Sequence, residues 1–212
     1  MRSLPDKCFE LVIADPPYGI GRDGQKEYVG KNPKANRKYF EAKGWDKSSP
    51  DVEFFEELRR VSENQVIWGA NHYISKIPYD SPCWIIWDKG QKGLSMADCE
   101  LAWTSFKRPA RVFLMNRVEL LKEGTIHPTQ KPVALYTWIL KNFAPPSATI
   151  FDPMMGSQSS RIAAYKMGFD YVGCELDPEY FAKGCERFNR ECKGEIVLPN
   201  GHIVTEQSLF EF

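Results

Sequence analysis

The chain has 212 residues, a formal net charge of zero, and a composition of 42% hydrophobic and 26% charged residues. This length suits one large domain with a buried core and is short for two. No apolar run approaches the ~20 residues of a membrane span and the first residues lack a signal-peptide core, so we expect a cytoplasmic protein without membrane contact. The six cysteines form no Cys-x-x-Cys pair, which disfavours structural zinc and a disulfide framework.

A mainly apolar run over residues 9–14 predicts a short buried strand. The two prolines after Asp15 cannot continue a hydrogen-bonded ladder, so the strand ends at this carboxylate. Asp15 and the Pro16 carbonyl can together accept both hydrogens of an exocyclic amine, and Tyr18 can stack on the ring that carries the amine. A strand that simply ends in a proline turn explains the same residues without any catalysis.

Residues 19–50 predict a long loop, because seven glycines and prolines interrupt the stretch and no hydrophobic period persists. Eight basic residues stand there against four acidic ones, and aromatic residues are interleaved with the lysines, which suits contact with bases and phosphates. Loops of this length are commonly functional or mobile. We therefore expect a mobile basic loop that closes over a bound base; a merely solvated surface is the alternative.

A helix is predicted over residues 51–61, capped by Ser49 or Asp51 and apolar on one face. Asn71 is expected to cap a short helix that follows. Strands are predicted over the apolar segments 64–69, 83–88 and 100–106.

A second basic stretch lies between Ser105 and Lys122, with five basic residues against one acidic residue, and predicts no particular structure. Segregated basic charge is what a polyanion-binding face requires. From the two basic stretches we select as candidate DNA contacts Lys31, Lys34, Arg37, Lys38, Lys107, Arg108 and Arg111.

His-Pro-Thr-Gln-Lys-Pro at residues 127–132 predicts a polar turn that enters a helix with Pro132 at its first position. His127 taken alone is expected to be an ordinary surface histidine. Downstream, residues 148–192 predict a strand, a Gly/Ser turn, a helix ended by Gly168, a second strand closed by Glu175, and a further helix from about residue 178. A small-residue turn followed by an acid about 20 residues later is the pattern of nucleoside binding in a doubly wound sheet.

Three motifs occur in order: Asp-Pro-Pro-Tyr at 15–18, His-Pro-Thr-Gln-Lys-Pro at 127–132, and Phe-Asp-Pro-Met-Met-Gly-Ser at 151–157. This succession resembles the beta group of S-adenosylmethionine-dependent DNA amino-methyltransferases, which methylate N6 of adenine or N4 of cytosine. The resemblance implies an α/β fold with a doubly wound, mostly parallel, Rossmann-like methyltransferase sheet and a circularly permuted motif order. It implies S-adenosyl-L-methionine as cofactor and double-stranded DNA as partner.

The resemblance also implies roles for individual residues. The target base is held by the catalytic residues Asp15, Pro16, Pro17 and Tyr18. The cofactor is bound by Asp152, Pro153, Gly156, Ser157, Glu175, Thr129 and Lys131. In this group, Asp rather than Ser before Pro-Pro-Tyr favours adenine.

We expect a single domain with a catalytic half over 1–106, a short target-recognition segment over 107–126, a cofactor half over 127–193 and a tail over 194–212. Two features depart from the family pattern. Gln158 replaces a glycine, so either the turn needs no positive φ there or the cofactor site is altered. The recognition segment is short, which favours a homodimer or a short target site.

The main hypothesis is a DNA adenine-N6 methyltransferase. The alternatives are a cytosine-N4 or RNA base methyltransferase, and a catalytically silent nucleic-acid-binding module. Residues 206–212 follow a predicted hairpin around Asn200-Gly201 and are expected to dock on the domain's own core. They also resemble, imperfectly, the peptides that bind bacterial sliding clamps.

Overall fold

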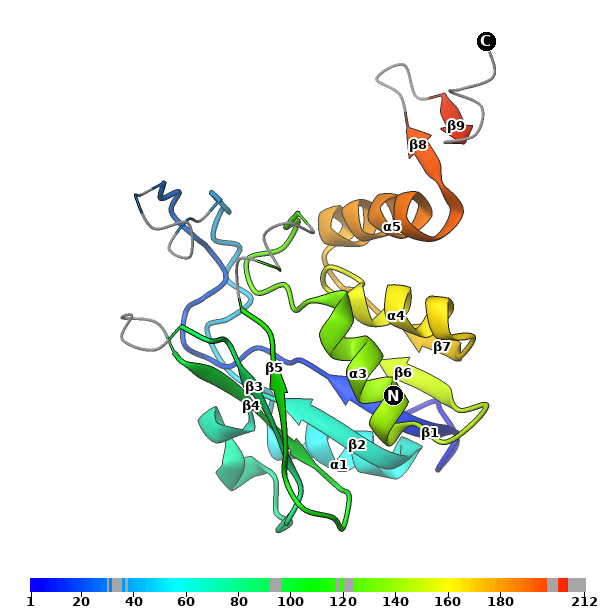
Figure 1. The fold of residues 1–212 in the computed structure, drawn as a ribbon. Helices are drawn as coiled ribbons and strands as arrows, with labels where there is room; N and C mark the ends of the chain where they lie inside the picture. The colour runs from blue at the N-terminus through cyan, green and yellow to red at the C-terminus, as the bar shows by residue number, and fades with distance from the viewer. Residues whose placement is uncertain are drawn as a thin grey trace.

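The computed structural model describes residues 1–29, 31, 36, 38–91, 97–116, 119, 124–197 and 202–205. One seven-stranded sheet with the order β5-β3-β4-β2-β1-β6-β7 runs through the molecule (Figure 1). Its strands are β1 (Phe9–Ala14), β2 (Ser62–Trp68), β3 (Trp84–Asp88), β4 (Cys99–Thr104), β5 (Arg111–Leu114), β6 (Thr149–Asp152) and β7 (Asp170–Gly173). β4 is antiparallel to both of its neighbours, and every other adjacent pair in this sheet is parallel. The predicted mostly parallel α/β sheet is confirmed.

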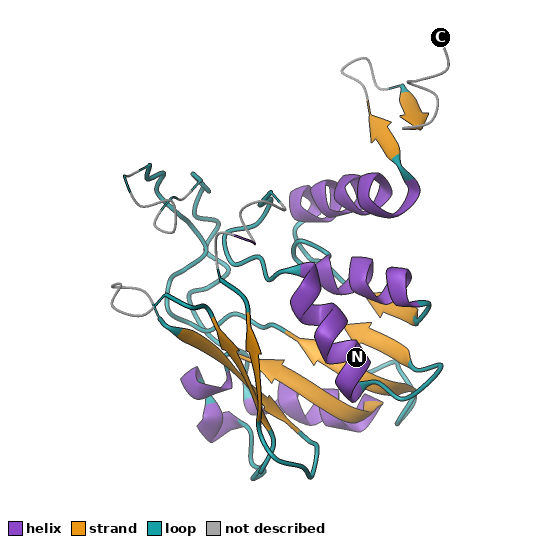
Figure 2. Ribbon diagram, viewed as in Figure 1, coloured by secondary structure: helices purple, strands orange, loops and turns teal. Residues whose placement is uncertain are grey.

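Helices cover both faces of the sheet (Figures 1 and 2). They are α1 (Val52–Val61) behind it, α3 (Val133–Phe143) and α4 (Ser159–Met167) in front, and α5 (Pro178–Lys193), which packs against α4. Two short 3-10 turns, η2 (Ala70–His72) and η3 (Ile74–Lys76), follow β2. Among the described residues, no helix is long and apolar enough to cross a membrane.

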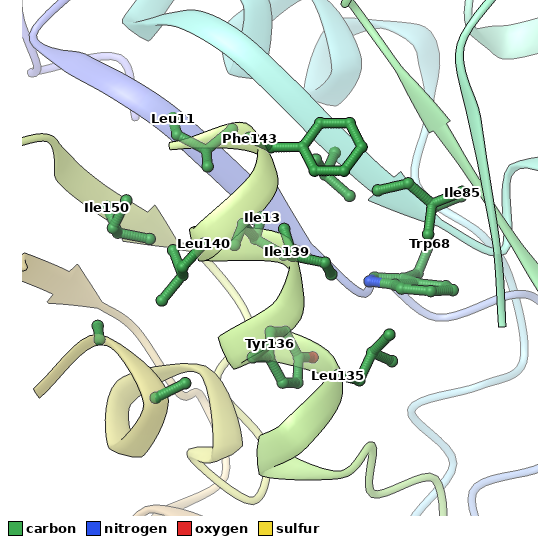
Figure 3. Packing of buried hydrophobic residues seen from close by; sticks show 14 of the residues in the cluster. Leu11, Ile13, Trp68, Ile85, Leu135, Tyr136, Ile139, Leu140, Phe143 and Ile150 are labelled. Carbon is green, nitrogen blue, oxygen red and sulfur yellow. The ribbon is translucent and has the colours of Figure 1, made fainter. Parts of the chain in front are cut away.

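Alternate side chains of β1 enter two separate cores. Leu11 and Ile13 pack with Leu135 and Ile139 of α3, as Figure 3 shows, whereas Val12 packs with the buried face of α1. Burial on both faces explains why β1 is an almost continuous apolar run rather than an alternating one. Each such fully buried aliphatic side chain contributes about 1.5–3 kcal/mol to folding, so the strand that ends at Asp15 is firmly fixed.

Local signals predicted most elements to within two residues. Asp51 caps α1 by accepting from the amide of Phe54 at 3.2 Å, and Gly168 ends α4 with a φ of 73°. The predicted C-terminal hairpin is present as β8 (Glu195–Val197) and β9 (Ile203–Thr205), which pair antiparallel. Its Asn200-Gly201 turn and the tail 206–212 lie outside the described residues.

Two expectations were wrong, and one strand was not predicted. Asn71 caps no helix; it lies inside η2, because Gly69 with a φ of 71° ends β2 and starts the turn. Pro132 occupies the N-cap position of α3 instead of the predicted first helical position, so the helix begins at Val133, one residue later than predicted. Residues 111–114 form β5, which the sequence did not reveal, because this edge strand leaves Val112 and Leu114 exposed and so lacks a regular alternation.

Candidate active site

The candidate site lies where the carboxyl ends of the parallel strands meet. β1 pairs with β2 on one side and with β6 on the other, and this change of direction opens a crevice in doubly wound sheets. A cavity of about 850 Å³ lies there. It is lined by every predicted catalytic and cofactor residue except Asp152, namely Asp15, Pro16, Pro17, Tyr18, Thr129, Lys131, Pro153, Gly156, Ser157 and Glu175.

The Asp15 carboxylate already accepts from two side chains. Its Oδ2 lies 2.5 Å from Nζ of Lys131, and its Oδ1 accepts from the hydroxyl of Tyr18 at 2.8 Å. Lys131 also lies 3.1 Å from Glu100, and Glu100 in turn lies 2.5 Å from Lys89. Four charges of alternating sign therefore form one row of ion pairs, of which Asp15 and Lys131 line the cavity.

Glu100 reaches this row because β4 is the antiparallel strand. An antiparallel strand begins at the edge where its parallel neighbours end, so the start of β4 faces the carboxyl ends of β1 and β2. Lys89 directly follows β3 and lies at the same edge, since Trp87 is paired with Glu100 in the β3–β4 register. Sequence inspection missed both residues because strand direction and register are not encoded near them in the chain.

Burial and the neighbouring charges oppose each other in setting the pKa values of this row. Burial raises the pKa of Asp15, and the Lys131 ammonium opposes that effect. Burial acts to lower the pKa of Lys131, but the carboxylates of Asp15 and Glu100 outweigh it and the value is raised. Glu100 is also desolvated, yet Lys131 and Lys89 lower its pKa to about 2. Lys131 and Glu100 are therefore both charged at neutral pH.

Tyr18 is held in place by its ring contacts. Its ring stacks on His72, with centroids 5.2 Å apart and an angle of 19° between the planes. The ring also lies directly over Gly69, where any Cβ would overlap it. Together with its hydrogen bond to Asp15, these contacts fix the aromatic plane beside the carboxylate.

The opposite side of the cavity is built from β6, β7 and their following turns. One oxygen of Glu175 accepts from the amide of Gly156 at 2.7 Å, and the other accepts from the amide of Asp177 at 2.9 Å. Asp177 caps α5 by accepting from the amides of Glu179 and Tyr180. The predicted acid at the end of the second strand therefore ties the Gly/Ser turn to the start of α5.

Asp152 is buried behind the cavity and does not line it. Its carboxylate accepts from the Ser160 hydroxyl at 2.5 Å and from the Met154 amide at 3.0 Å. Burial raises the pKa of Asp152 to about 7. Asp152 therefore supports the turn after β6, and the structure does not place its carboxylate at the cavity wall, where a direct contact with the cofactor was predicted.

Gln158 adopts the left-handed conformation, with φ of 61° and ψ of 24°. The turn thus needs a positive φ and obtains it without glycine. The buried side chain offsets the strain by donating to the Phe181 carbonyl at 3.1 Å and accepting from Arg161 at 2.8 Å. Gly184 on α5 makes room for it, because a Cβ there would overlap the Gln158 side chain. The Gln158 side chain, which has no counterpart in the family pattern, is therefore accommodated against α5, behind the turn.

The end of the long basic loop reaches the side of the cavity that is formed by Glu175 and the start of α5. Lys43 lies 2.8 Å from Asp177 and 2.6 Å from Glu179, and its ammonium stands 4.4 Å from the Tyr180 ring centroid. Trp45 stacks on His127 with centroids 5.3 Å apart. We call these contacts of Lys43 and Trp45 the loop clasp. Lys43 and Trp45 therefore hold the end of the loop against α5 and His127.

His127 is not the ordinary surface histidine that its sequence context suggested. It lines the cavity between Trp45 and Tyr180, and its ring lies edge-on to Tyr180 at 4.3 Å. Burial lowers its pKa to about 4, with Lys131 adding to the effect, so the ring is neutral at pH 7.

The candidate DNA contacts fall into three groups. Lys31, Lys38, Lys107 and Arg111 are exposed. Arg108 instead lies over the Phe143 ring at 3.8 Å and donates to the Asn142 carbonyl, so its guanidinium is engaged by α3. Lys34 and Arg37 lie outside the described residues.

Comparison with known proteins identifies related sequences and folds. A family model for DNA methylases matches residues 103–185. YubD, a predicted methylase of Escherichia coli (strain K12), is 27% identical over 212 residues, covering 88% of this chain and 85% of YubD. DNA adenine methyltransferase YhdJ of the same strain is 34% identical over 84 residues, covering 39% of this chain and 29% of YhdJ.

These sequence matches are consistent with an N6/N4 amino-methyltransferase of DNA. The fold agrees with two solved structures of such enzymes. The M1.HpyAVI–SAM complex superposes with a TM-score of 0.58 at 20% identity, covering 89% of this chain and 91% of that one. PvuII DNA methyltransferase, specific for cytosine N4, superposes with a TM-score of 0.56 at 13% identity, covering 92% and 89%.

S-adenosylmethionine is the cofactor of this family. The cavity suits a ligand of that chemistry in size and lining, because nucleoside-sized ligands occupy sites of roughly 300–1,000 Å³. It offers a carboxylate for hydroxyl groups at Glu175 and apolar surface at Met155 and Leu176.

Proposed function

We propose that this protein transfers the methyl group of S-adenosylmethionine to N6 of adenine in double-stranded DNA, on a base turned out of the duplex. The observation that carries the proposal is the shared cavity. An oriented carboxylate with an adjacent aromatic ring lies on one side of it, and the Glu175–Gly156 turn lies on the other. A target amine and a methyl donor held on these two sides would face each other.

Asp15 is proposed to activate the amine. An exocyclic amine on an aromatic ring is a poor nucleophile because its lone pair is delocalised into the ring. Acceptance of both N–H groups by Asp15 and the Pro16 carbonyl directs the lone pair away from the ring plane. When bound, S-adenosylmethionine supplies a methyl group on a positively charged sulfur. The Asp15 carboxylate stabilises the positive charge that develops on nitrogen and then accepts its proton.

Tyr18 is proposed to stack on the target base. Turning a base out of the duplex costs a few kcal/mol, and stacking returns part of that cost. Pro17 keeps the backbone rigid between the carboxylate and the ring.

Glu175 is proposed to accept from the ribose hydroxyls of the cofactor. Each of its oxygens accepts one backbone amide, which leaves further lone pairs for a ligand. Pro153, Gly156, Ser157 and Thr129 line the remainder of the cavity. Lys131 pairs with Asp15 and Glu100, so any contact with the cofactor would come in addition to this pairing.

Two observations favour adenine. Asp rather than Ser precedes Pro-Pro-Tyr, and YhdJ, named as a DNA adenine methyltransferase, shares 34% identity over 84 residues. Cytosine N4 is the alternative, because the PvuII enzyme has the same fold.

Mass spectrometry of nucleosides from methyl-free DNA incubated with the protein and S-adenosylmethionine distinguishes adenine from cytosine as the target. We expect N6-methyldeoxyadenosine; N4-methyldeoxycytidine or methylated RNA nucleosides would contradict the proposal. Failure to bind S-adenosylmethionine in calorimetry would favour a silent binding module.

Lys31, Lys34, Arg37, Lys38, Lys107 and Arg111 are proposed to contact phosphates. Each phosphate bound adds about −0.9 to the slope of log K against log salt. Neutralising Lys31, Lys34, Arg37 and Lys38 together should flatten this slope by about 0.9 for each phosphate that is no longer bound. An unchanged slope would mean that the loop is only solvated surface.

Three further expectations have their own tests. Sedimentation of the protein bound to DNA would test the expected homodimer. A clamp pull-down would test the tail, and fractionation would test the cytoplasmic location.

A further inference from the structure

We propose that Glu100, braced by Lys89, is a positioning residue that holds the Lys131 ammonium against Asp15 and remains its counter-ion when Asp15 takes up a proton. The inference rests on the proposed function only in taking Asp15 as the acceptor of the amine proton. No sequence motif assigns a role to Glu100 or Lys89.

The ammonium of Lys131 has no freedom left. Its Nζ lies 2.5 Å from Asp15, 3.1 Å from Glu100 and 3.1 Å from the Tyr18 hydroxyl oxygen, which accounts for all three N–H donors. Only 2% of the Lys131 side chain is exposed. A buried ammonium with three fixed acceptors has one orientation, and Glu100 supplies one of the three.

Charge balance gives Glu100 a second task. In the proposed reaction the amine lone pair forms the new C–N bond while the S–C bond breaks and its electron pair stays on sulfur. An N–H bond then breaks, its electron pair returns to nitrogen, and the proton forms an O–H bond on Asp15. Asp15 is now neutral, and without Glu100 the buried Lys131 would have no anionic partner, which proteins avoid. Glu100 keeps Lys131 paired through this step.

Lys89 keeps Glu100 itself ionised and in position. The second Glu100 oxygen lies 2.5 Å from Lys89, whose ammonium also stands 5.0 Å from the Trp87 ring centroid. The four charges of the row cancel one another. After proton transfer to Asp15 the row carries one net positive charge.

The arrangement predicts that Glu100 and Lys131 shift the pKa of Asp15 in opposite directions. The negative charge of Glu100 raises the pKa of Asp15 and the positive charge of Lys131 lowers it. Removing the charge of Glu100 should therefore lower the pKa of Asp15, and removing that of Lys131 should raise it. The other titratable groups that face Asp15 are the same in both variants: Tyr18, Tyr73, Tyr136 and Asp152.

The experiment compares Glu100→Gln and Lys131→Met with Glu53→Gln, a control at an exposed residue of α1 that pairs with Arg2. The Asp15 carboxyl is followed by carbon-13 NMR with labelled aspartate, its resonance being assigned by its loss in Asp15→Asn. We expect the titration to move to lower pH by roughly one unit in Glu100→Gln, the size expected for a like charge within about 6 Å. It should move to higher pH in Lys131→Met and stay unchanged in Glu53→Gln.

The pH dependence of kcat/KM, measured on methyl-free genomic DNA, provides the second readout. Its acid limb should move in the same two directions, while calorimetry shows S-adenosylmethionine affinity within about twofold of wild type in Glu100→Gln, whose contacts lie outside the cofactor side. An Asp15 titration that is identical in Glu100→Gln and Glu53→Gln would overturn the inference. NMR needs no turnover, so failure of the proposed methyl transfer is distinguished from failure of this arrangement. Should Lys131→Met not fold, the isosteric Glu100→Gln alone decides.

Discussion

The two sides of the cavity are closed by ion pairs of different kinds. On the base side, Lys131 is 2% exposed and its partners come from strand ends and their first following residues. On the cofactor side, Lys43 joins a loop to α5, and its partner Glu179 is 55% exposed. Buried pairs of fixed geometry resist salt, whereas exposed pairs are screened and contribute little. The difference indicates that the ion pairs around Lys131 are the more rigid and that those of Lys43 are the more sensitive to salt.

The largest expected effect is at Asp15. Asp15→Ala should reduce methyl transfer by a factor of roughly 10²–10³ or more, the loss that follows removal of one preorganised electrostatic group. Calorimetry should show S-adenosylmethionine affinity within a fewfold of wild type, because the Glu175 turn is untouched. Asp170→Ala, at the exposed start of β7, is the control. Near wild-type turnover of Asp15→Ala would refute the assignment of the base side.

Glu175 tests the cofactor side directly. Glu175→Ala should weaken S-adenosylmethionine binding by about 1–3 kcal/mol, because a charged acceptor for buried hydroxyls is removed. Glu175→Gln keeps the shape and one acceptor oxygen, and should lie between the wild type and the alanine variant in affinity. If both variants bind the cofactor like the wild type, the hydroxyl acceptor lies elsewhere, and Asp177 becomes the candidate.

Gln158 tests whether the cofactor turn depends on its support from α5. Gln158→Ala keeps the left-handed backbone and loses the hydrogen bonds to Phe181 and Arg161. Gln158→Gly loses the same bonds but relieves the strain, which is worth about 1 kcal/mol. We therefore expect the glycine variant to be more stable than the alanine variant by about 1 kcal/mol in urea denaturation. The reverse order would mean that the positive φ carries no strain.

The smallest effect is expected at the loop clasp. Lys43→Met should weaken S-adenosylmethionine binding at low salt by no more than about fivefold, since exposed pairs contribute up to about 1 kcal/mol. The difference from wild type should fade near 1 M salt, where the screening length is only about 3 Å. Lys47→Met, at a neighbouring exposed lysine, is the control. A defect that persists at high salt would show that the clasp acts through packing rather than charge.

The features that could be predicted from the sequence are those whose signal lies within a short stretch of the chain. β1, α4 and the Gly168 cap follow from apolar runs and turn residues within a few positions, and the cavity unites residues that three short motifs had named. Glu100 and Lys89 had no such signal, since only the antiparallel pairing of β4 brings them to Lys131. Trp45 had no local signal of its own within the loop, because its stacking on His127 joins segments some eighty residues apart.

The absence of a side chain at Gly69 has a consequence for the mutational tolerance of the gene. A methyl group there would overlap the Tyr18 ring, and the φ of 71° at this buried residue strains every other L-amino acid. A substitution at this codon should therefore displace the aromatic plane and also cost about 1–2 kcal/mol of folding free energy. In a saturation library selected for modified DNA, position 69 should return glycine alone, and a screen for folded protein should favour glycine less strictly.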